Sequence, residues 1–285
     1  MPIRIIINAD DLGLSPIVNE EIDKAIECGY ITSTTILANT EYMEDVKQII
    51  KKHPNASFGI HLNLTQGKAI TDSIILREAG IVDYNNCFTG DVRHMTSLSK
   101  ATLNAILEEW TAQLTRLCEN GIKPSHIDGH HHIHSKFELQ SILLKVSRKF
   151  GIKRVRNRYS KPLKWKFEKK VNAQVSTTTP VNDGEKRQVN PTTKSKKTNL
   201  LEYLINSIMW STRLKISGYK TTAYFDSYAS CMKSISVGKT YPKNCTIELM
   251  CHPGHIDYTE EYKSICNRSI DKFINNSKYI SYNEL

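Results

Sequence analysis

Residues 3–16, IRIIINADDLGLSP, predict a strand that leads directly into a helix. Ile3–Asn8 is a continuous apolar run, which is typical of a parallel strand buried on both faces. Asp10 and Asp11 follow this run. Ser15-Pro16 then has the residue types of a helix start, with Ser as the N-cap and Pro in the first turn. The stretch therefore indicates a strand–turn–helix unit with two carboxylates at the turn.

The same alternation of strand and helix continues along the chain. Further strands are predicted at Thr32–Leu37, Ser57–Leu64, Ser125–Asp128, Lys153–Arg156 and Thr246–Cys251. Further helices are predicted at Met43–Lys52, Lys100–Glu119, Phe137–Phe150, Leu200–Leu214 and Glu260–Asn275. Such alternation implies βαβ units and a parallel sheet in an α/β fold, either a barrel or a doubly wound sheet. Nucleotide binding has no motif support, because no Gly-x-Gly-x-x-Gly follows the first strand and no Walker lysine is present.

Two stretches interrupt the alternation. Residues 66–98 lack clear periodicity, and we expect a long loop over one end of the sheet. Residues 158–199 pass from a Lys-rich, aromatic run into a Thr/Asn/Lys/Pro-rich stretch, which we interpret as a basic surface insertion. An α/β barrel of about 250 residues or more can be one domain. We therefore predict a single catalytic domain over residues 1–285 that carries both insertions.

The positive charge of the chain is concentrated in one segment. The whole chain has 39 Lys+Arg against 29 Asp+Glu, a formal net charge of +10. Residues 145–200 hold 17 Lys+Arg and three Asp+Glu, so the rest of the chain has 22 basic and 26 acidic residues. The basic character therefore belongs to this segment, and its main effect is on which molecules approach the protein.

Composition excludes several classes of protein. The 39% hydrophobic and 24% charged fractions exclude a collagen-like or wholly disordered chain, and no apolar run approaches the ~20 residues of a membrane span. The seven scattered cysteines contain no Cys-x-x-Cys and indicate neither a disulfide framework nor a zinc ribbon. The N-terminal apolar run is too short for a signal peptide, so we expect a cytoplasmic protein without a membrane partner.

Four polar clusters follow predicted strands. They are Asn8–Asp11, Gly59–Asn63, His126–His134 and Cys251–His255, and they contain eight of the ten histidines. Ligands of parallel α/β folds bind at the carboxyl ends of the strands, so these clusters should converge on one pocket.

The residue types in these clusters indicate a catalytic metal site. Five histidines within residues 126–134 are typical of metal binding, whereas Asp10-Asp11, His61 and residues 252–255 would each, taken alone, also fit a turn or a packed histidine. One carboxylate with two neutral imidazoles leaves coordination positions open for water and substrate. A second carboxylate can then act as general base and a further histidine as general acid.

Four ordered motifs resemble one family of enzymes. NADDLGLS (8–15), GIHLNLT (59–65), PSHIDGHHHIH (124–134) and ELMCHPGH (248–255) look like the motifs of the YdjC-like carbohydrate deacetylases. The resemblance runs from about residue 3 to residue 257, except for the 158–199 insertion. It implies a (β/α) barrel-like deacetylase domain with mainly parallel strands, which uses one divalent metal ion, Mg²⁺ or Zn²⁺, to remove acetyl groups from N-acetylated sugars and release acetate.

The resemblance also implies roles for individual residues. Asp11, His61 and His130 match the metal-binding positions, Asp10 the general base and His252 the probable general acid. Asp128 and His126 match as well, and we expect them to orient the metal ligands. His255 stands where the family varies, so no catalytic role is assigned to it.

Arg156 is a candidate outside the motifs. It follows a predicted short strand, and an arginine there can fix a carboxylate or bind the substrate. The competing interpretation is an ordinary surface arginine.

Two other functions remain open from the sequence. A metal-dependent phosphoesterase would need a second ion about 3.5–4 Å from the first, for which His132 and His134 are spare. A binding protein would use the basic 145–200 segment to hold an anionic polymer, since lysines alternate there with Trp165 and Phe167. We expect an N-acetylated sugar as the partner and no nucleic acid, and the resemblance is compatible with a homodimer.

Overall fold

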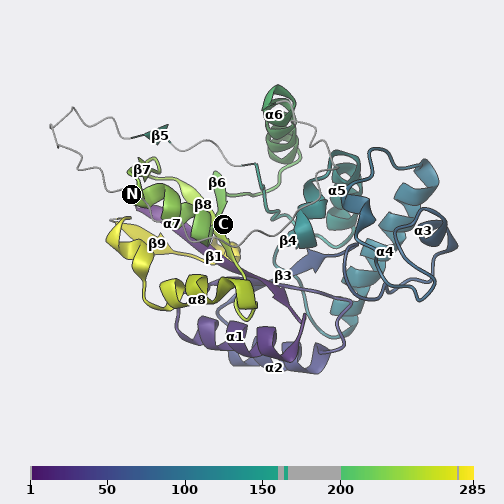
Figure 1. Cartoon of the computed structure of the whole chain (residues 1–285), viewed down its shortest axis with the longest axis horizontal. Coiled ribbons are helices and arrows are strands. Elements are labelled where there is room, and N and C mark those ends of the chain that lie inside the picture. The colour runs from purple at the N-terminus through teal and green to yellow at the C-terminus, as the bar shows by residue number, and fades with distance from the viewer. Residues whose placement is uncertain (1, 160–163, 166–199, 275) are drawn as a thin grey trace, which may run out of the picture.

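The centre of the protein is a curled sheet whose strands all pair in parallel (Figure 1). The computed structural model describes residues 2–159, 164–165, 200–274 and 276–285. The order across the sheet is β4-β3-β2-β1-β8-β6, and β9 also pairs with β1. The strands are β1 (Ile3–Leu12), β2 (Ser33–Ile36), β3 (Ser57–Leu62), β4 (Ile127–Gly129), β6 (Tyr224–Ser227), β8 (Thr246–Cys251) and β9 (Ser277–Tyr279). The predicted α/β fold with mainly parallel strands is confirmed.

The curled sheet forms part of a barrel. Parallel bridges join Val155 to Ile127 of β4 and Arg154 to Lys220, which lies just before β6. Residues 153–156, predicted as a short strand, therefore lie between the two outer strands of the sheet. One antiparallel pair, β5 (Lys164–Trp165) with β7 (Lys239–Thr240), stands apart from the main sheet.

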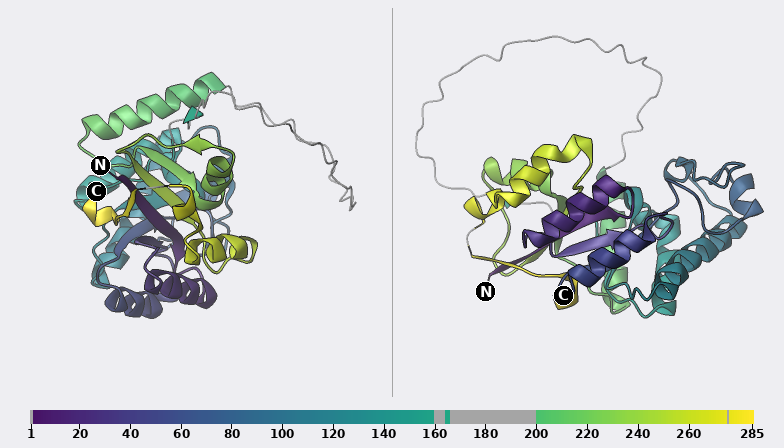
Figure 2. Two further views of the ribbon diagram at one scale, coloured as in Figure 1. Left: turned by 90° about the vertical axis from the view of Figure 1, so that its left-hand side faces the viewer. Right: turned by 90° about the horizontal axis from the view of Figure 1, so that it is seen from below.

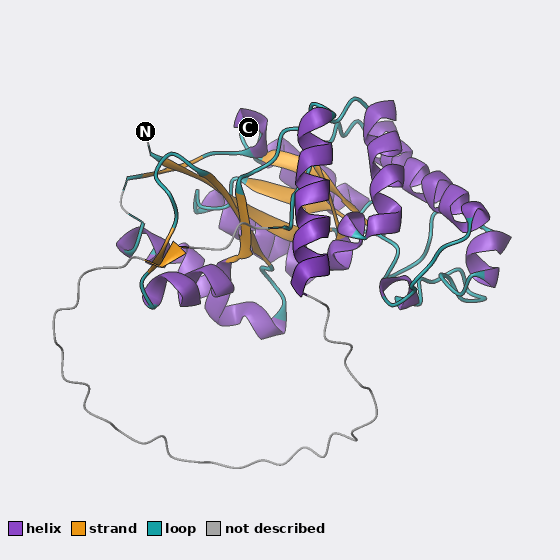
Figure 3. Ribbon diagram, turned by 90° about the horizontal axis from the view of Figure 1, so that it is seen from above, coloured by secondary structure: helices purple, strands orange, loops and turns teal. Residues whose placement is uncertain are grey.

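Helices surround the sheet, as the views from the side and from above show (Figures 2 and 3). They are α1 (Pro16–Glu27), α2 (Met43–Lys52), α3 (Ile74–Glu78), α4 (Lys100–Glu119), α5 (Phe137–Lys149), α6 (Leu200–Ile216), α7 (Tyr228–Ser236) and α8 (Thr259–Cys266). Ser15 caps α1 as predicted, because its hydroxyl accepts from the backbone N–H of Val18. None of the helices in the described ranges combines the length and the apolar character that a membrane crossing requires.

The two faces of the strands differ in chemistry. In β1, Ile5, Ile7 and Ala9 belong to the main apolar core. The alternate residues Asn8 and Asp10 are also buried, but they have polar partners: Asn8 donates to Thr35 of β2, and Asp10 accepts from Arg156. Because successive side chains of a strand point to opposite faces, the inner face of the curled sheet is polar while the outer face packs on helices.

The helix predicted over residues 260–275 is present but shorter than expected. The helix α8 ends at Cys266, and a short 3-10 turn follows at Ser269–Lys272. Arg268 between them adopts a left-handed conformation with φ of 50°, which ends an α-helix. Its guanidinium lies over the ring of Tyr30, 4.4 Å from the centroid.

The predicted loop over residues 66–98 is more structured than expected. It contains α3 and a 3-10 turn at Asp91–Arg93, and it buries Leu76 and Val92. Glu109 of α4 anchors its start, because this carboxylate accepts hydrogen bonds from the backbone N–H groups of Ile70 and Thr71. Most of the predicted insertion at 158–199 lies outside the described residues.

Gly59 of β3 marks a tight contact inside the sheet. A Cβ atom at this position would lie 2.6–2.7 Å from three atoms of the His126 imidazole. That ring cannot easily move, since it stacks on Tyr282 with 3.7 Å between centroids and lies in hydrogen-bond range of Asn8 and Ser125. The close approach of the two strands therefore requires glycine.

We expect Gly59→Ala to lower the free energy of unfolding by about 1–3 kcal/mol, the usual cost of overpacking a close-packed core. The measurement is urea denaturation of the wild type and the variant. The same substitution made in a His126→Ala background should cost much less, because the clashing ring is gone. An equal cost in both backgrounds would show that the contact with His126 is not the cause.

Candidate functional site

A pocket opens where the parallel strands end. Its volume is about 630 Å³. Many of the residues that line it come from the four polar clusters of the sequence: Asp10, Asp11, His61, His130, His131, His132, His252 and His255. Gln66, Arg93, Arg158 and Tyr258 lie outside those clusters and also line the pocket. The structure thus brings the predicted clusters to one place at the carboxyl edge of the sheet.

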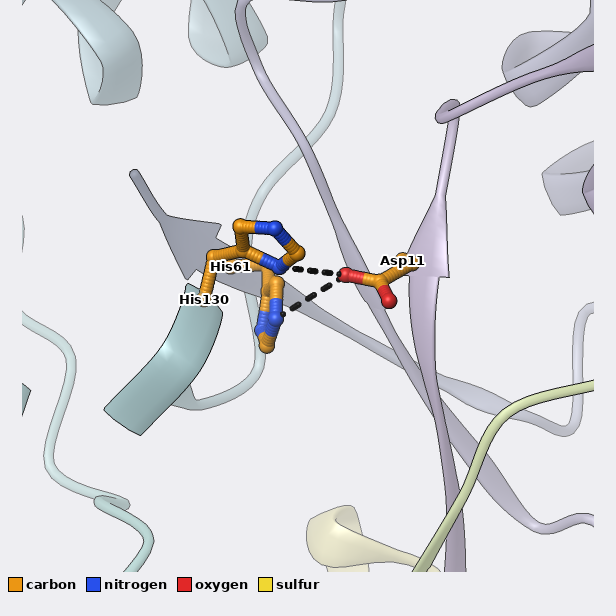
Figure 4. Close-up of side chains that lie close together, drawn as sticks. All are labelled: Asp11, His61 and His130. Atoms are coloured by element: carbon orange, nitrogen blue, oxygen red, sulfur yellow. Dashed lines mark ion pairs between the residues drawn. The ribbon is translucent and has the colours of Figure 1, made fainter. Parts of the chain in front are cut away.

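Asp11, His61 and His130 converge on one point of this pocket (Figure 4). Oδ1 of Asp11 lies 2.8 Å from Nδ1 of His130 and 3.2 Å from Nε2 of His61. One ligand atom from each residue lies within 4.8 Å of the others. All three side chains are buried, so solvent has little access to their polar atoms.

A β-bulge places both aspartates at the site. Between Ala9 and Leu12 the register of β1 against β2 shifts by one residue, and Asp11 has a φ of 73°. In a regular strand Asp10 and Asp11 would point to opposite faces of the sheet. The extra residue and the left-handed turn redirect one of them, so two consecutive carboxylates face the same pocket.

Hydrogen bonds fix how the two histidines present their nitrogens. Nδ1 of His61 lies 2.6 Å from Oδ1 of Asp128, and Nε2 of His130 lies 2.9 Å from Oε1 of Gln66. Each of these acceptors requires a proton on the ring nitrogen that it faces. Once the ring is neutral, as metal binding requires, the opposite nitrogen would carry a lone pair on the side of Asp11, which is the usual arrangement of metal-binding histidines.

The electrostatics of this group suit a cation. Oδ1 of Asp11 is buried and has no well-formed hydrogen bond within the described residues, although two ring nitrogens lie close to it. Burial alone would raise the pKa of Asp11, but the surrounding histidines hold it well below the usual value. Burial would likewise lower the pKa of His61, yet the carboxylates of Asp128, Asp11 and Asp10 raise it to about 10. The three ligand atoms therefore need protons or a metal cation between them, so the donor set fits a metal.

Arg156 lies beneath this group and bridges three carboxylates. Its guanidinium makes two hydrogen bonds to Asp10, at 2.6 and 2.7 Å, and it lies 2.8 Å from Oδ2 of Asp128 and 2.7 Å from Oε1 of Glu248. The side chain is completely buried. Arg156 thus fixes carboxylates, one of its two predicted roles, and the interpretation as a surface arginine is wrong. The guanidinium carbon of Arg156 also lies over the aromatic ring of Phe225, 5.2 Å from the ring centroid.

Asp10 is held in its ionised form. Oδ1 accepts from Arg156 and from the amide of Asn8 at 2.8 Å, and Oδ2 lies 4.0 Å from Nε2 of His61. Burial would raise the pKa of Asp10, but the arginine holds it well below its usual range. The carboxylate is therefore held in its charged form, and Oδ2, which accepts one hydrogen bond from Arg156, keeps a second lone pair.

Asp128 contacts one of the three converging side chains directly, whereas His126 lies farther from them. Asp128 contacts His61 directly, and the hydroxyl of Thr35 also donates to it at 3.1 Å. His126 makes no contact with the three converging side chains but lies 3.1 Å from Oδ1 of Asn8, which in turn binds Asp10. The predicted orienting role fits the position of Asp128 directly and that of His126 only through Asn8.

His252 lies at the edge of the pocket after β8. Its backbone N–H donates to Oε2 of Glu261 at 3.1 Å, and its ring packs on Tyr258 at 4.7 Å between centroids. Burial lowers the pKa of His252, although Asp10 and Asp11 act in the opposite direction. Its Nδ1 is buried and has no hydrogen-bond partner among the described residues.

Within the part of the chain that the structure describes, the remaining histidines of residues 126–134 do not form a second cluster with carboxylates. His131 and His132 have φ values of 51° and 57°, so the chain turns sharply after His130. Nδ1 of His131 lies 2.9 Å from the hydroxyl of Thr65. Burial lowers the pKa of His132 to about 3, and His134 is fully buried with neither ring nitrogen hydrogen-bonded within the described chain.

Several site residues escaped the sequence analysis. Gln66 and Thr35 orient His130 and His61, but nothing in the sequence sets these common polar residues apart. Glu248 carried a usable signal, because it is a single charged residue within the apolar strand TIELMC. His255 received no role, yet its Nε2 lies 3.2 Å from Oδ2 of Asp11.

The sequence is similar to one family of proteins and to several relatives named carbohydrate deacetylase. A family model described as YdjC-like protein matches residues 4–277. A carbohydrate deacetylase of Oceanobacillus iheyensis is 36% identical over 151 residues, which are 52% of this chain and 63% of that relative. The match thus spans less than two thirds of that relative. A carbohydrate deacetylase of Clostridium beijerinckii is 24% identical over 99% of this chain and 100% of its own length.

The fold also matches a solved structure. The crystal structure of an Enterococcus faecalis protein assigned to cellobiose-phosphate cleavage superimposes with a TM-score of 0.66 and 20% sequence identity. The alignment covers 100% of this chain and 99% of the other. At this identity the likeness concerns the fold alone.

We expect Arg156→Met to lower the free energy of unfolding by about 3–5 kcal/mol, because it leaves buried carboxylates without their cation. The matched variant is Glu248→Gln. Burial raises the pKa of Glu248 to about 7, so its neutral form is already accessible near neutral pH. This variant should cost only about 0.5–1.5 kcal/mol, as for one hydrogen bond. Urea denaturation checks both values, and equal losses would refute the central role of Arg156.

Proposed function

This chain belongs to the YdjC-like protein family, and from this membership and the geometry of its pocket we propose that it is a hydrolase that removes acetyl groups from N-acetylated sugars. The observation that carries the proposal is the convergence of Asp11, His61 and His130 in a pocket that Asp10 and His252 also line. The relatives named carbohydrate deacetylase support the substrate class.

Asp11, His61 and His130 would hold one divalent metal ion. Such an ion polarises a carbonyl and lowers the pKa of water, which is the chemistry that amide hydrolysis requires. Two imidazoles and one carboxylate suit Zn²⁺ better than Mg²⁺ on ligand type, although the family resemblance includes Mg²⁺. Three protein ligands leave coordination positions free, as in catalytic sites rather than closed structural ones.

Asp10 would act as the general base. A base must be deprotonated, and Arg156 together with Asn8 keeps this carboxylate ionised and fixed in orientation. The free lone pair on Oδ2 lies on the side of His61, and therefore next to the proposed metal site. The low pKa makes Asp10 a weak base, so it requires a water whose own pKa is lowered.

His252 would act as the general acid. Its imidazolium is a stronger acid than an ordinary histidine, because burial lowers its pKa. It can therefore release a proton readily to the departing sugar amine. Tyr258 packs against its ring and limits its motion.

The phosphoesterase alternative loses support from the position of Arg156. A second group of possible ligands exists at Asp10, His61 and Asp128. The guanidinium already contacts both carboxylates of that group at 2.6–2.8 Å, so a permanent cation takes the place that a second metal would need. Binding of an anionic polymer through residues 145–200 concerns a segment that lies largely outside the described residues.

We expect the purified protein to release acetate from N-acetylglucosamine oligomers, and a chelator to abolish the release. Asp10→Asn should lower kcat by about 10²–10⁴-fold, the usual contribution of a general base. Asp72→Asn is the matched control, since Asp72 is exposed and forms a surface ion pair with Arg77. Acetate is measured by a coupled assay. Full activity of Asp10→Asn would show that Asp10 is not the general base. Acetate release that persists after metal depletion would show that the reaction does not need a metal.

Metal binding should also depend on pH in a defined direction. With a pKa of about 10, His61 is protonated at pH 7 in the metal-free protein, and a metal must displace that proton. The apparent affinity should therefore rise by about tenfold per pH unit between pH 6 and 9. Calorimetric titrations in buffers of different ionisation enthalpy count the protons released. A binding constant that does not change with pH would contradict His61 as a ligand.

A further inference from the structure

His255 lies on the far side of Asp11 from the two other histidines. Its Nε2 is 3.2 Å from Oδ2 of Asp11, whereas His61 and His130 both face Oδ1. We propose that His255 is a positioning residue that holds Oδ2 and so directs Oδ1 at the metal. The inference rests on the proposed metal site and adds to it a residue that the family resemblance leaves without a role.

The geometry separates His255 from the ligands themselves. The ligand atoms of Asp11, His61 and His130 lie within 4.8 Å of one another, and His255 does not belong to that group. An ion bound to Oδ1 and to the two imidazoles would leave Oδ2 as the remaining acceptor of the carboxylate. Nε2 of His255 lies 3.2 Å from this oxygen and has no well-formed hydrogen bond within the described residues, so its N–H is the nearby donor that can occupy Oδ2.

The backbone of the loop explains how His255 reaches this position. Gly254 has a φ of 81°, and a Cβ atom there would lie 2.7 Å from Cα of Val18 and 3.0 Å from the carbonyl oxygen of Ile17. The loop is therefore pressed against the first turn of α1, which only glycine allows. This contact turns the following side chain back over the end of β1, where Asp11 lies.

Ring contacts hold the imidazole in place. The His255 ring packs edge-on against Tyr258 at 6.1 Å and against His252 at 5.5 Å between centroids. Its side chain is 27% exposed, so it borders the pocket rather than the core. Substitution of His255 should therefore affect the site more than the overall stability.

The position of Asp11 explains why a partner for Oδ2 matters. It stands on a bulge with a left-handed backbone. Within the described residues neither oxygen has a regular backbone hydrogen bond. If Oδ2 were released, the carboxylate could rotate or bind the ion with both oxygens and occupy a position that the substrate requires.

The test compares the binding of Co²⁺ to the wild type, His255→Ala and His255→Gln by calorimetry at one pH. His255→Ala should weaken binding by about 10–100-fold, the range found when a hydrogen-bond partner of a metal ligand is removed. His255→Gln can donate from its amide at a similar distance, so it should recover most of the loss. His94→Ala serves as the control, because His94 is exposed and lies outside the polar clusters.

The visible absorption of bound Co²⁺ gives a second readout, because its band positions and intensity report the number of ligands. His255→Ala should keep the spectrum of the wild type at saturating Co²⁺. An unchanged affinity of His255→Ala would overturn the inference, and so would a spectrum that shows the loss of a ligand. His61→Ala distinguishes failure of the proposed metal site from failure of the role of His255. If this variant binds Co²⁺ as tightly as the wild type, His61 is not a metal ligand and the metal site itself is wrong.

Discussion

The interaction on which the site depends is the contact of one buried guanidinium with three buried carboxylates. Arg156 meets Asp10, Asp128 and Glu248 at distances of 2.6–2.8 Å inside the curled sheet. Carboxylates of three different strands would repel one another in this low-dielectric interior without it. The arginine therefore allows β1, β4 and β8 to carry acidic residues on their inner faces. It also fixes the two groups that serve the pocket above, because Asp10 lines it and Asp128 orients His61.

A second constraint is the irregular backbone of the pocket. Asp11, His131 and His132 all have positive φ although none is glycine. Each conformation costs of order 1–3 kcal/mol, and such residues cluster at functional sites. Here the irregularity of β1 gives two adjacent carboxylates different tasks: one is tied to Arg156, and the other faces the histidines. A regular strand would send one of them to the apolar outer face, which packs against the helices.

The sequence predicted those parts of the structure that depend on local pattern. The bounds of α2, α4 and β8 agree with the prediction, and the sequence motifs alone point to Asp11, His61 and His130, which the structure brings together. What it missed depends on relations between strands. The strand β6 and the helix α7 lie in a stretch of weak periodicity, and the break at Arg268 is a single backbone angle. The inner polar layer was missed because isoleucines dominate residues 3–8, although Asn8 belongs to that layer, and the contact of His255 with Asp11 requires the fold of a loop remote in sequence.

The charged centre also constrains when this protein can finish folding. Tyr282 is fully buried, stacks on His126 and donates a hydrogen bond to Glu248, and the backbone N–H of the same residue donates to Ser33, 249 positions earlier in the chain. Contacts over such separations form late and slow the folding reaction. During synthesis on the ribosome, β1 to β4 and Arg156 therefore emerge long before Glu248 and Tyr282. Until then the guanidinium lacks its third carboxylate and the inner face of the sheet lacks the ring that covers it.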